Sequence, residues 1–233
     1  MSVRWTALAC DYDGTLADHG RVRPATLAAL RRVRQSRRKL LLVTGRELDQ
    51  LCGIFPRLEL FDRVVAENGA VIYDPASRRR RLLAGKPPRE FVDALRARRV
   101  EPLSVGSAIV ATLRRHQHEV SEVIRGLGLP LEVILNKRSL MVLPAGVNKA
   151  SGLREALREI GIAPSATVGI GDAENDADFL ALCGCSAAVA NALPMLKRKV
   201  NVVTSAAFGE GVIELANHLL NGSVSFRYRS SPQ

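Results

Sequence analysis

Two aspartates stand directly after an apolar run near the start of the chain. Residues 6–10 have the composition of a buried β-strand, and Asp11, Asp13 and Gly14 follow them. Side chains alternate along a strand, so the two carboxylates can point into one crevice. They repel each other there unless a cation lies between them or one of them holds a proton. The pair therefore indicates a metal site, a proton-transfer role or both, and an Asx-type turn that only closes the strand is the simpler alternative.

Three further polar clusters follow in the sequence, two of them at the end of an apolar run, at 39–43 and at 166–171. In an open α/β sheet, ligands bind outside the carboxyl ends of the strands, so clusters on neighbouring strands meet at one edge. The sequence therefore predicts an α/β fold with a Rossmann-like parallel sheet and one composite site. The three clusters are Thr44, Gly45 and Arg46, then Asn148 and Lys149, then Asp172, Asn175 and Asp176.

These four motifs, in this order, resemble those of the haloacid dehalogenase (HAD) superfamily, and specifically its Cof-type, subclass IIB sugar-phosphate phosphatases. The resemblance extends from residue 7 to about residue 220 and includes residues 67–70, a Glu-Asn-Gly-Ala segment typical of Cof-type proteins. It implies the HAD fold and a magnesium-dependent hydrolysis of a small phosphorylated metabolite through an aspartyl-phosphate intermediate. A sugar phosphate or an organic-acid phosphate such as phosphoglycolate would be the substrate. A phosphomutase of the same fold is the enzymatic alternative.

The resemblance also implies a role for each motif residue. Asp11 is the nucleophile, and Asp13 is the general acid and base. Mg²⁺ is held by the carboxylates of Asp11 and Asp172 and by the main-chain carbonyl of Asp13. Asp176 lies behind them and orients a lysine or a metal-bound water. The substrate-binding residues are Thr44, Gly45, Arg46, Lys149 and Asn175.

Some of these residues also have a simple structural interpretation. Thr44 is an ordinary residue for the start of a helix. Arg46 could hold that helix start or reach the substrate, and the sequence does not decide between the two. Lys149 falls in the first turn of a predicted helix, where the helix dipole disfavours a cation. An anionic neighbour is therefore expected for Lys149.

The composition changes at residue 75, where a basic segment begins. Residues 75–144 are predicted to form an α+β cap domain inserted into a catalytic core of residues 1–74 and 145–233. Within the cap we expect helices at 88–99 and 116–127 and strands at 108–113, 131–135 and 140–143. The family resemblance implies that the cap closes over the site and selects the leaving group. Candidate selectors are Arg114, Arg115, His116, His118, Asn136, Lys137 and Arg138.

Periodicity and turn residues predict the remaining core elements. The Asn68-Gly69 step is a hairpin signal between two β-rich runs. The last residues, 221–233, are predicted to form a loose tail. Other helices are expected at 24–33, 47–52, after residue 149 and at 210–220, and other strands at 64–66, 186–190 and 200–204.

The chain is strongly basic, with 34 Lys and Arg against 23 Asp and Glu, a net charge of +11. Such a charge attracts polyanions, so a nonenzymatic nucleic-acid-binding module is the alternative from a different class. Aromatic residues make up only 4% of the chain, and they do not alternate with basic residues as in proteins that stack bases. We therefore expect a surface that suits anionic metabolites and no specific nucleic-acid partner.

The remaining features restrict the location of the protein. The four cysteines have neither the spacing of a disulfide framework nor the Cys-x-x-Cys pairs of a zinc site. No apolar run approaches the roughly 18 residues that a membrane span needs. The first strand begins without a segment that resembles a cleavable signal. We expect a cytoplasmic monomer or homodimer.

Overall fold

Eight strands form one sheet whose spatial order differs from their order in the chain. The computed structural model describes residues 5–221. The strands are β1 (Ala7–Asp11), β2 (Lys39–Val43), β3 (Arg63–Ala66), β4 (Val71–Asp74), β5 (Arg79–Leu82), β10 (Thr167–Gly171), β11 (Cys185–Ala188) and β12 (Val202–Val203). They follow the order β12-β11-β10-β1-β2-β3-β4-β5. All are parallel as far as β3, whereas β4 and β5 form an antiparallel edge. The predicted α/β fold with a parallel core is confirmed.

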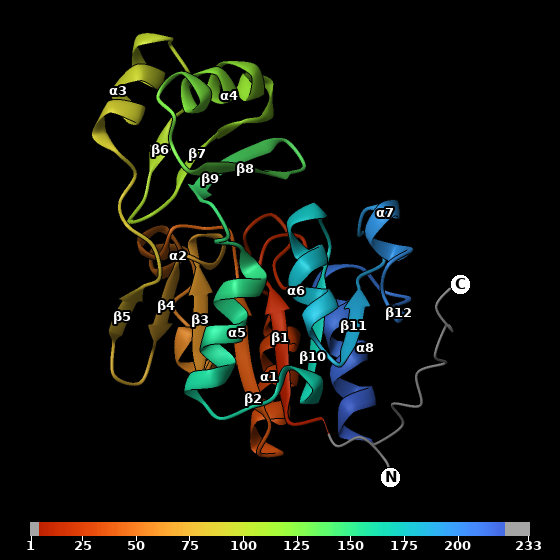
Figure 1. Cartoon of the computed structure of the whole chain (residues 1–233). Coiled ribbons are helices and arrows are strands. Elements are labelled where there is room, and N and C mark those ends of the chain that lie inside the picture. The colour runs from red at the N-terminus through yellow and green to blue at the C-terminus, as the bar shows by residue number, and fades with distance from the viewer. Residues whose placement is uncertain (1–4, 222–233) are drawn as a thin grey trace.

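Helices cover both faces of this sheet. Figure 1 shows α1 (Pro24–Gln35) and α8 (Phe208–Leu220) on one face, with α5 (Lys149–Glu159) and α6 (Ala177–Leu182) on the other. All five residues of β1 are buried as a result. Double coverage explains why the run before Asp11 is apolar throughout instead of alternating. The two short helices α2 (Leu48–Ile54) and α7 (Pro194–Lys197) complete the α-helices of the large unit within the described residues.

A second, antiparallel sheet lies above the carboxyl ends of the parallel strands (Figure 1). Its order is β6-β7-β9-β8. Helices α3 and α4 pack on it around an apolar cluster that includes Phe91, Leu95 and Val120. This α+β unit is the part of the chain that we propose as the cap. Its elements are α3 (Arg89–Ala97), β6 (Ser104–Val105), β7 (Val110–Leu113), α4 (Gln117–Gly126), β8 (Leu131–Asn136) and β9 (Ser139–Pro144).

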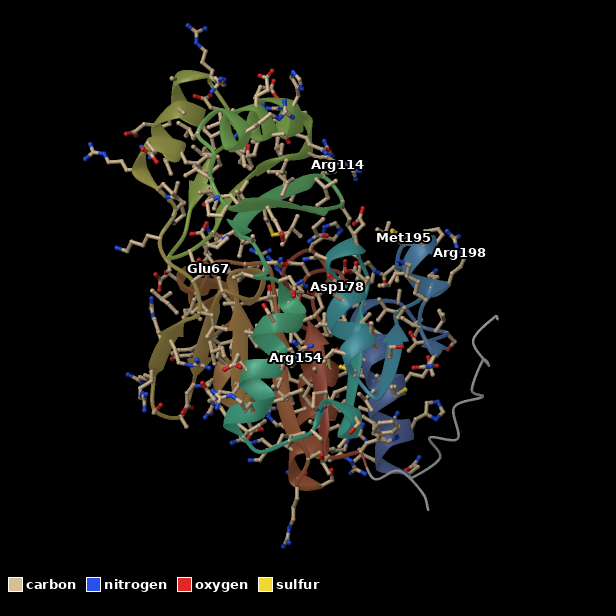
Figure 2. The ribbon with its side chains drawn as sticks, in the orientation of Figure 1. Glu67, Arg114, Arg154, Asp178, Met195 and Arg198 are labelled. Atoms are coloured by element: carbon tan, nitrogen blue, oxygen red, sulfur yellow. The ribbon has the colours of Figure 1, made fainter. Side chains whose placement is uncertain are left out.

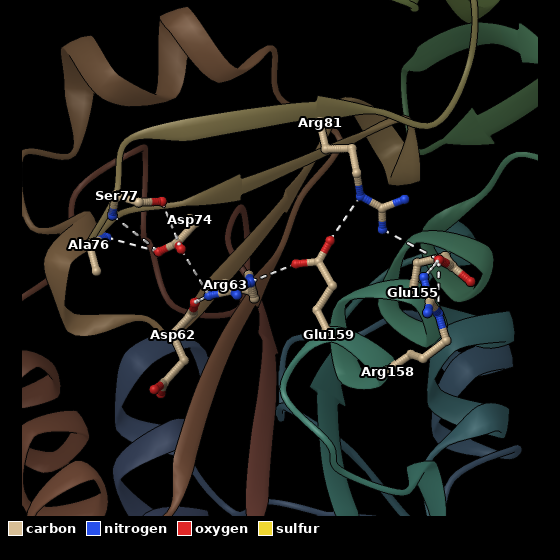
Figure 3. Close-up of polar contacts among 9 residues, drawn as sticks. All are labelled: Asp62, Arg63, Asp74, Ala76, Ser77, Arg81, Glu155, Arg158 and Glu159. Carbon is tan, nitrogen blue, oxygen red and sulfur yellow. Dashed lines mark hydrogen bonds and ion pairs between the residues drawn. The ribbon is translucent and has the colours of Figure 1, made fainter.

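Strand β5 falls inside the range 75–144, which the sequence assigned to the cap. It pairs with β4, so its residues belong to the large sheet. The insert that we propose as the cap therefore begins after Leu82. This strand was not predicted from the sequence, because its three consecutive arginines do not show the apolar alternation of a half-buried strand. They suit an exposed sheet edge, and one of them, Arg81, contacts Glu155 and Glu159 on α5 (Figure 3).

An apolar seam and a buried carboxylate join the two sheets. Ala70 of the core packs with Ile109 and Met141 of the cap. The carboxylate of Glu67 accepts hydrogen bonds from the backbone N–H groups of Ser107, Ala108 and Ile109 at 2.7 to 3.2 Å. Figure 2 shows Glu67 where the two sheets meet. Glu67 thus holds the connection between β6 and β7 of the second sheet against the core.

Most predicted elements are present, and their ends differ by a few residues. The Asn68-Gly69 step joins antiparallel β3 and β4 as predicted, through the 3-10 turn η2 (Glu67–Gly69). Elements β5, β6 and α7 were not predicted. The tail predicted at 221–233 lies, from residue 222, outside the described residues. None of the described helices is long and apolar enough to cross a membrane.

Candidate active site

Three of the four motifs follow adjacent strands in the middle of the large sheet. Strand β1 lies between β10 and β2, and Asp11 is in register with Val43. Thr44 therefore follows β2 beside Asp11, and Asp172 follows β10 on the other side. The fourth motif comes from α5, which packs against η2 and β3. The topology brings all four motifs to one edge, as predicted.

Three buried carboxylates gather at this edge. Asp11, Asp172 and Asp176 each offer one oxygen, and these oxygens lie within 4.8 Å of one another. All three side chains are at least 95% buried. The carboxylate of Asp13 is not part of this group among the described residues, and Asp176 is. Asp176 also accepts hydrogen bonds from the N–H groups of Asp172 and Ala173 at 2.8 and 3.0 Å, which holds the η5 turn (Glu174–Asp176) in place.

Burial makes this concentration of negative charge unfavourable. Burial raises the pKa of Asp11 well above its usual range, Asp176 raises it further, and Lys149 opposes both. Burial also raises the pKa of Asp172 to about 6, against the effect of Lys137. Asp11 Oδ2 is buried without a hydrogen-bond partner among the described residues. A divalent cation would offset the repulsion among the three carboxylates, so the group fits a metal that prefers oxygen ligands.

Lys149 provides a buried positive charge between two of these aspartates. Its Nζ lies 2.6 Å from Asp11 Oδ1 and 2.6 Å from Asp176 Oδ1. Burial alone would lower the pKa of Lys149, but the two aspartates outweigh it and raise the pKa. The anionic neighbours expected from its position in the first helical turn are therefore present.

The backbone around Lys149 explains how a buried lysine is placed there. Asn148 caps α5, and its side chain accepts a hydrogen bond from Ser151 N–H while the Ser151 hydroxyl accepts one from Asn148 N–H. A Cβ atom on Gly69 would lie 1.9 Å from the Asn148 carbonyl oxygen. Only glycine permits this approach, and Gly69 also has a φ of +108°. The Asn68-Gly69 signal therefore has a second role, the close docking of α5.

Arg46 contacts Asp13 through two hydrogen bonds. Its Nε and Nη2 atoms donate to the two carboxylate oxygens at 2.6 and 2.7 Å. The guanidinium also lies over the Tyr12 ring, 5.7 Å from its centroid. The pKa of Arg46 is raised, chiefly by the hydrogen bonds to Asp13. These contacts place the Arg46 side chain beside Asp13, and its contact with the substrate remains a prediction.

The remaining motif residues leave polar atoms free at the site. Thr44 is fully buried, and its hydroxyl oxygen accepts a hydrogen bond from Arg46 N–H at 3.1 Å. Asn175 Nδ2 donates to Asn68 Oδ1 at 2.9 Å. Asn175 Oδ1 and Asn68 Nδ2 are buried without partners among the described residues. Buried polar groups are rarely left unpaired, so these atoms are candidates for ligand contacts.

The loop after β1 depends on Gly14 and on a residue that sequence reasoning missed. Gly14 has a φ of +84°, and a Cβ atom there would lie 2.1 Å from Asp172 Oδ2. Asn191 holds this loop, because its Nδ2 donates to the Gly14 carbonyl at 2.8 Å and its Oδ1 accepts from Phe208 N–H. No local pattern in the sequence marks this contact of Asn191.

Of the seven candidate selectors in the cap, only some lie toward the core. The ammonium of Lys137 forms an ion pair with Asp172, and its N–H donates to Glu174 Oε2 at 2.9 Å. Arg114 Nη1 lies 3.6 Å from Glu174 Oε1. By contrast, Arg115 and His116 contact a cap carbonyl, that of Glu101, and His118 lies 3.3 Å from Glu122 on its own helix.

Glu174 is a second residue that was missed, although it lies inside the last motif. Its carboxylate contacts Lys137 and Arg114, so it connects the core motif to the cap. A pocket of about 400 Å³ between β8 and the core is lined by Glu174, Arg114 and Asn175, among others. The site is thus bounded by the cap on one side and by the four motifs on the other.

Comparison with known proteins identifies the family. The sequence profile of the haloacid dehalogenase-like hydrolases matches residues 8–122 and 131–215. The chain belongs to this family. It is 29% identical over 236 residues to a phosphoglycolate phosphatase of Aeropyrum pernix, covering 95% of each chain. It is 31% identical over 227 residues to one of Methanothermobacter thermautotrophicus, covering 92% of this chain and 98% of that one.

The fold comparison agrees with the family assignment. The solved structure of a HAD subclass IIB sugar phosphatase superimposes with a TM-score of 0.73 at 20% identity, covering 91% of this chain and 98% of that one. At this identity the likeness shows the fold alone. The predicted superfamily and Cof-type family are confirmed.

Proposed function

We propose that this HAD-like hydrolase is a magnesium-dependent phosphatase that cleaves the phosphate monoester of a small metabolite through a phosphoryl group on Asp11. One observation carries the proposal. Asp11 stands at the end of the central strand with one oxygen paired to Lys149 and the other, Oδ2, without a partner among the described residues. A carboxylate oxygen held in a buried site beside a cation is placed to attack phosphorus.

The chain's own residues supply what phosphoryl transfer needs. The Asp11 oxygen forms a bond to phosphorus as the bond to the leaving oxygen breaks. Asp13 gives its proton to that oxygen and later accepts a proton from the water that releases phosphate from Asp11. The two hydrogen bonds from Arg46 hold the Asp13 carboxylate at the site. Binding of the transferred group falls to Thr44, the Gly45 backbone, Lys149 and Asn175.

The carboxylates of Asp11 and Asp172, with the Asp13 carbonyl, would hold Mg²⁺. Asp176 lies in the same group but also contacts Lys149 at 2.6 Å, which supports a role in orienting that lysine. When bound, the ion neutralises charge on the phosphoryl oxygens. The oxygen-only ligand set is the observation that favours Mg²⁺ over softer metals.

The names of the relatives indicate the class of substrate. Both are phosphoglycolate phosphatases. A phosphorylated hydroxy acid is therefore the first substrate to test, followed by sugar phosphates. The ion pairs of Arg80 with Asp49 and of Arg81 with α5 leave less free charge for the nucleic-acid alternative. A cytoplasmic location and a monomer or homodimer remain predictions.

The deciding experiment measures release of inorganic phosphate from a panel of phosphate monoesters with and without Mg²⁺. We expect steady turnover that stops in excess chelator. Asp11→Asn should reduce kcat by about 10⁴-fold or more while leaving the circular dichroism spectrum unchanged. Isomerisation of the substrate without steady phosphate release would favour the phosphomutase alternative. Turnover by Asp11→Asn at the normal rate would contradict the role of Asp11.

A further inference from the structure

A lysine of the cap contacts one of the buried aspartates of the site. Each of the four motif aspartates forms an ion pair, and among the described residues only Asp172 is paired with a residue of the cap, Lys137. The ammonium also lies 3.0 Å from the position that a Cβ atom would take on Gly14. It therefore lies against the loop that follows the proposed nucleophile.

The hairpin that carries Lys137 holds it firmly in this direction. Asn136 pairs with Ser139, so the β8–β9 connection has two residues, Lys137 and Arg138. Lys137 N–H donates to Glu174, and Arg114 Nη1 donates to the Lys137 carbonyl at 3.3 Å. The tip of the hairpin is thus attached to the core by its backbone, and the side chain extends from an anchored point.

Lys137 also stands in an unusual backbone conformation. Its φ is +52°, in the left-handed region that most residues avoid and that glycine adopts readily. Strained backbone tends to persist at functional sites. Glycine would suit this turn better, so the hairpin itself gives no reason for a lysine.

Charge explains what Lys137 would bind in the working enzyme. The ammonium of Lys137 would be repelled by a divalent ion held at Asp172, since like charges a few ångströms apart are costly outside bulk water. The lysine side chain is 42% exposed and flexible enough to turn away from Asp172. An ammonium has three donors and no acceptor, and its strongest partners are anions. A second anionic group on the substrate, close to the transferred phosphoryl group, would take the place of Asp172.

We propose that Lys137 is a specificity-determining residue that binds a carboxylate on the leaving group. This inference rests on the proposed phosphatase function and narrows it to phosphate monoesters of small hydroxy acids. The backbone hydrogen bond to Glu174 keeps Lys137 near Gly14 after its side chain leaves Asp172, so the carboxylate must be only a few bonds from the phosphoryl group. A neutral leaving group cannot form an ion pair with Lys137, and a long leaving group would place its charge too far away.

The test compares two esters of nearly equal size. In 2-phosphoglycolate a carboxylate stands where 2-hydroxyethyl phosphate has a hydroxymethyl group. We expect the wild-type enzyme to favour 2-phosphoglycolate in kcat/KM, and Lys137→Met to reduce that preference by about 10- to 100-fold, the effect of one charge-assisted hydrogen bond. Lys137→Arg keeps the charge and should retain part of the preference. Arg138→Met removes a charge from the same turn and is the matched control.

A second measurement does not depend on turnover. In the Asp11→Asn background, calorimetry should show tighter binding of 2-phosphoglycolate than of 2-hydroxyethyl phosphate, and Lys137→Met should remove the difference. Lys137→Gly should do the same without destabilising the hairpin. An unchanged preference in Lys137→Met, or an equal loss for both esters, would overturn the proposal.

The two proposals fail in different ways. Absence of phosphate release from every ester tested would contradict the phosphatase function, and calorimetry would still decide whether Lys137 recognises a carboxylate. Release of phosphate from both esters without preference, in wild type and variant alike, would contradict the role of Lys137 alone.

Discussion

Two groups of ion pairs in this protein have the same chemistry and different surroundings. In the site, Lys149 bridges Asp11 and Asp176, and all three side chains are at least 95% buried. At the sheet edge, Arg81 bridges Glu155 and Glu159, with side chains 25% to 39% exposed (Figure 3). Removing one partner of a buried pair leaves an uncompensated charge, whereas water replaces a partner at the surface. We therefore expect the stability of the fold to depend on the buried ion pairs of Lys149 more than on the exposed ion pairs of Arg81.

The largest effect is expected at Lys149. Lys149→Met leaves the buried Asp11 and Asp176 without their cation and should lower the free energy of unfolding by about 3–5 kcal/mol at pH 7.5 without divalent ions. Urea unfolding followed by circular dichroism measures the change. Lys39→Met is the control, because Lys39 pairs with Asp62 at 2.7 Å but is 47% exposed. Equal losses in both variants would mean that burial does not distinguish the two kinds of pair.

The response of stability to Mg²⁺ should also distinguish the buried ion pair of Lys149 from the exposed ion pair of Lys39. An ion held by the carboxylates that Lys149→Met leaves unpaired would restore part of the lost stability in that variant. Lys39→Met should gain no more than the wild type does. Thermal unfolding with and without MgCl₂ checks both, and the absence of any stabilisation by Mg²⁺ in all three proteins would contradict the metal site.

The sequence predicted where Asp11 and Lys149 would lie, but it did not predict what Lys137 and Arg46 would contact. Asp11 follows a run that is apolar because it is covered on both faces, and the position of Lys149 in a helical turn already required an anion. Lys137 was one of seven cap candidates, because the direction of a hairpin depends on tertiary docking that no local pattern records. Arg46 stayed ambiguous for the same reason, since its partner Asp13 is 33 residues away.

Replacing Asp172 should raise the free energy of unfolding by a moderate amount, whereas replacing Lys149 should lower it. Its pKa is raised to about 6 in the folded chain, above the value of roughly 3.9 in an unfolded one. The folded state therefore binds the proton more tightly, and stability is lost as the pH rises through 6. Without divalent ions, Asp172→Asn should be more stable than wild type by about 1–3 kcal/mol at pH 7.5 and about equal at pH 4.

Urea unfolding at several pH values between 4 and 8 measures this difference. A constant difference across that range would contradict the raised pKa. Addition of Mg²⁺ at pH 7.5 should stabilise the wild type more than the variant, because the variant lacks one of the two carboxylates that would hold the ion.

A smaller effect is expected where the cap meets the core. Glu174 contacts Lys137 at 2.9 Å and Arg114 at 3.6 Å. Glu174→Gln weakens these charge-assisted contacts and should raise KM by several-fold, up to about tenfold, with a smaller change in kcat. Glu122→Gln on the cap helix α4, where Glu122 pairs with His118, is the matched control. A fall in kcat with KM unchanged would show that Glu174 acts on the chemistry instead of on the cap.

The smallest effect is expected at Arg81, although it contacts two carboxylates. Arg81→Met should change the free energy of unfolding by no more than about 1 kcal/mol, because water solvates Glu155 and Glu159 once the arginine is gone. The other partners of these glutamates remain, since Arg158 contacts Glu155 at 2.9 Å and Arg63 contacts Glu159 at 2.7 Å. The small difference should shrink further in 1 M NaCl, where the Debye length falls to about 3 Å. A loss above about 2 kcal/mol, insensitive to salt, would show that this exposed network supports the fold as the buried one does, and the contrast with Lys149 would no longer hold.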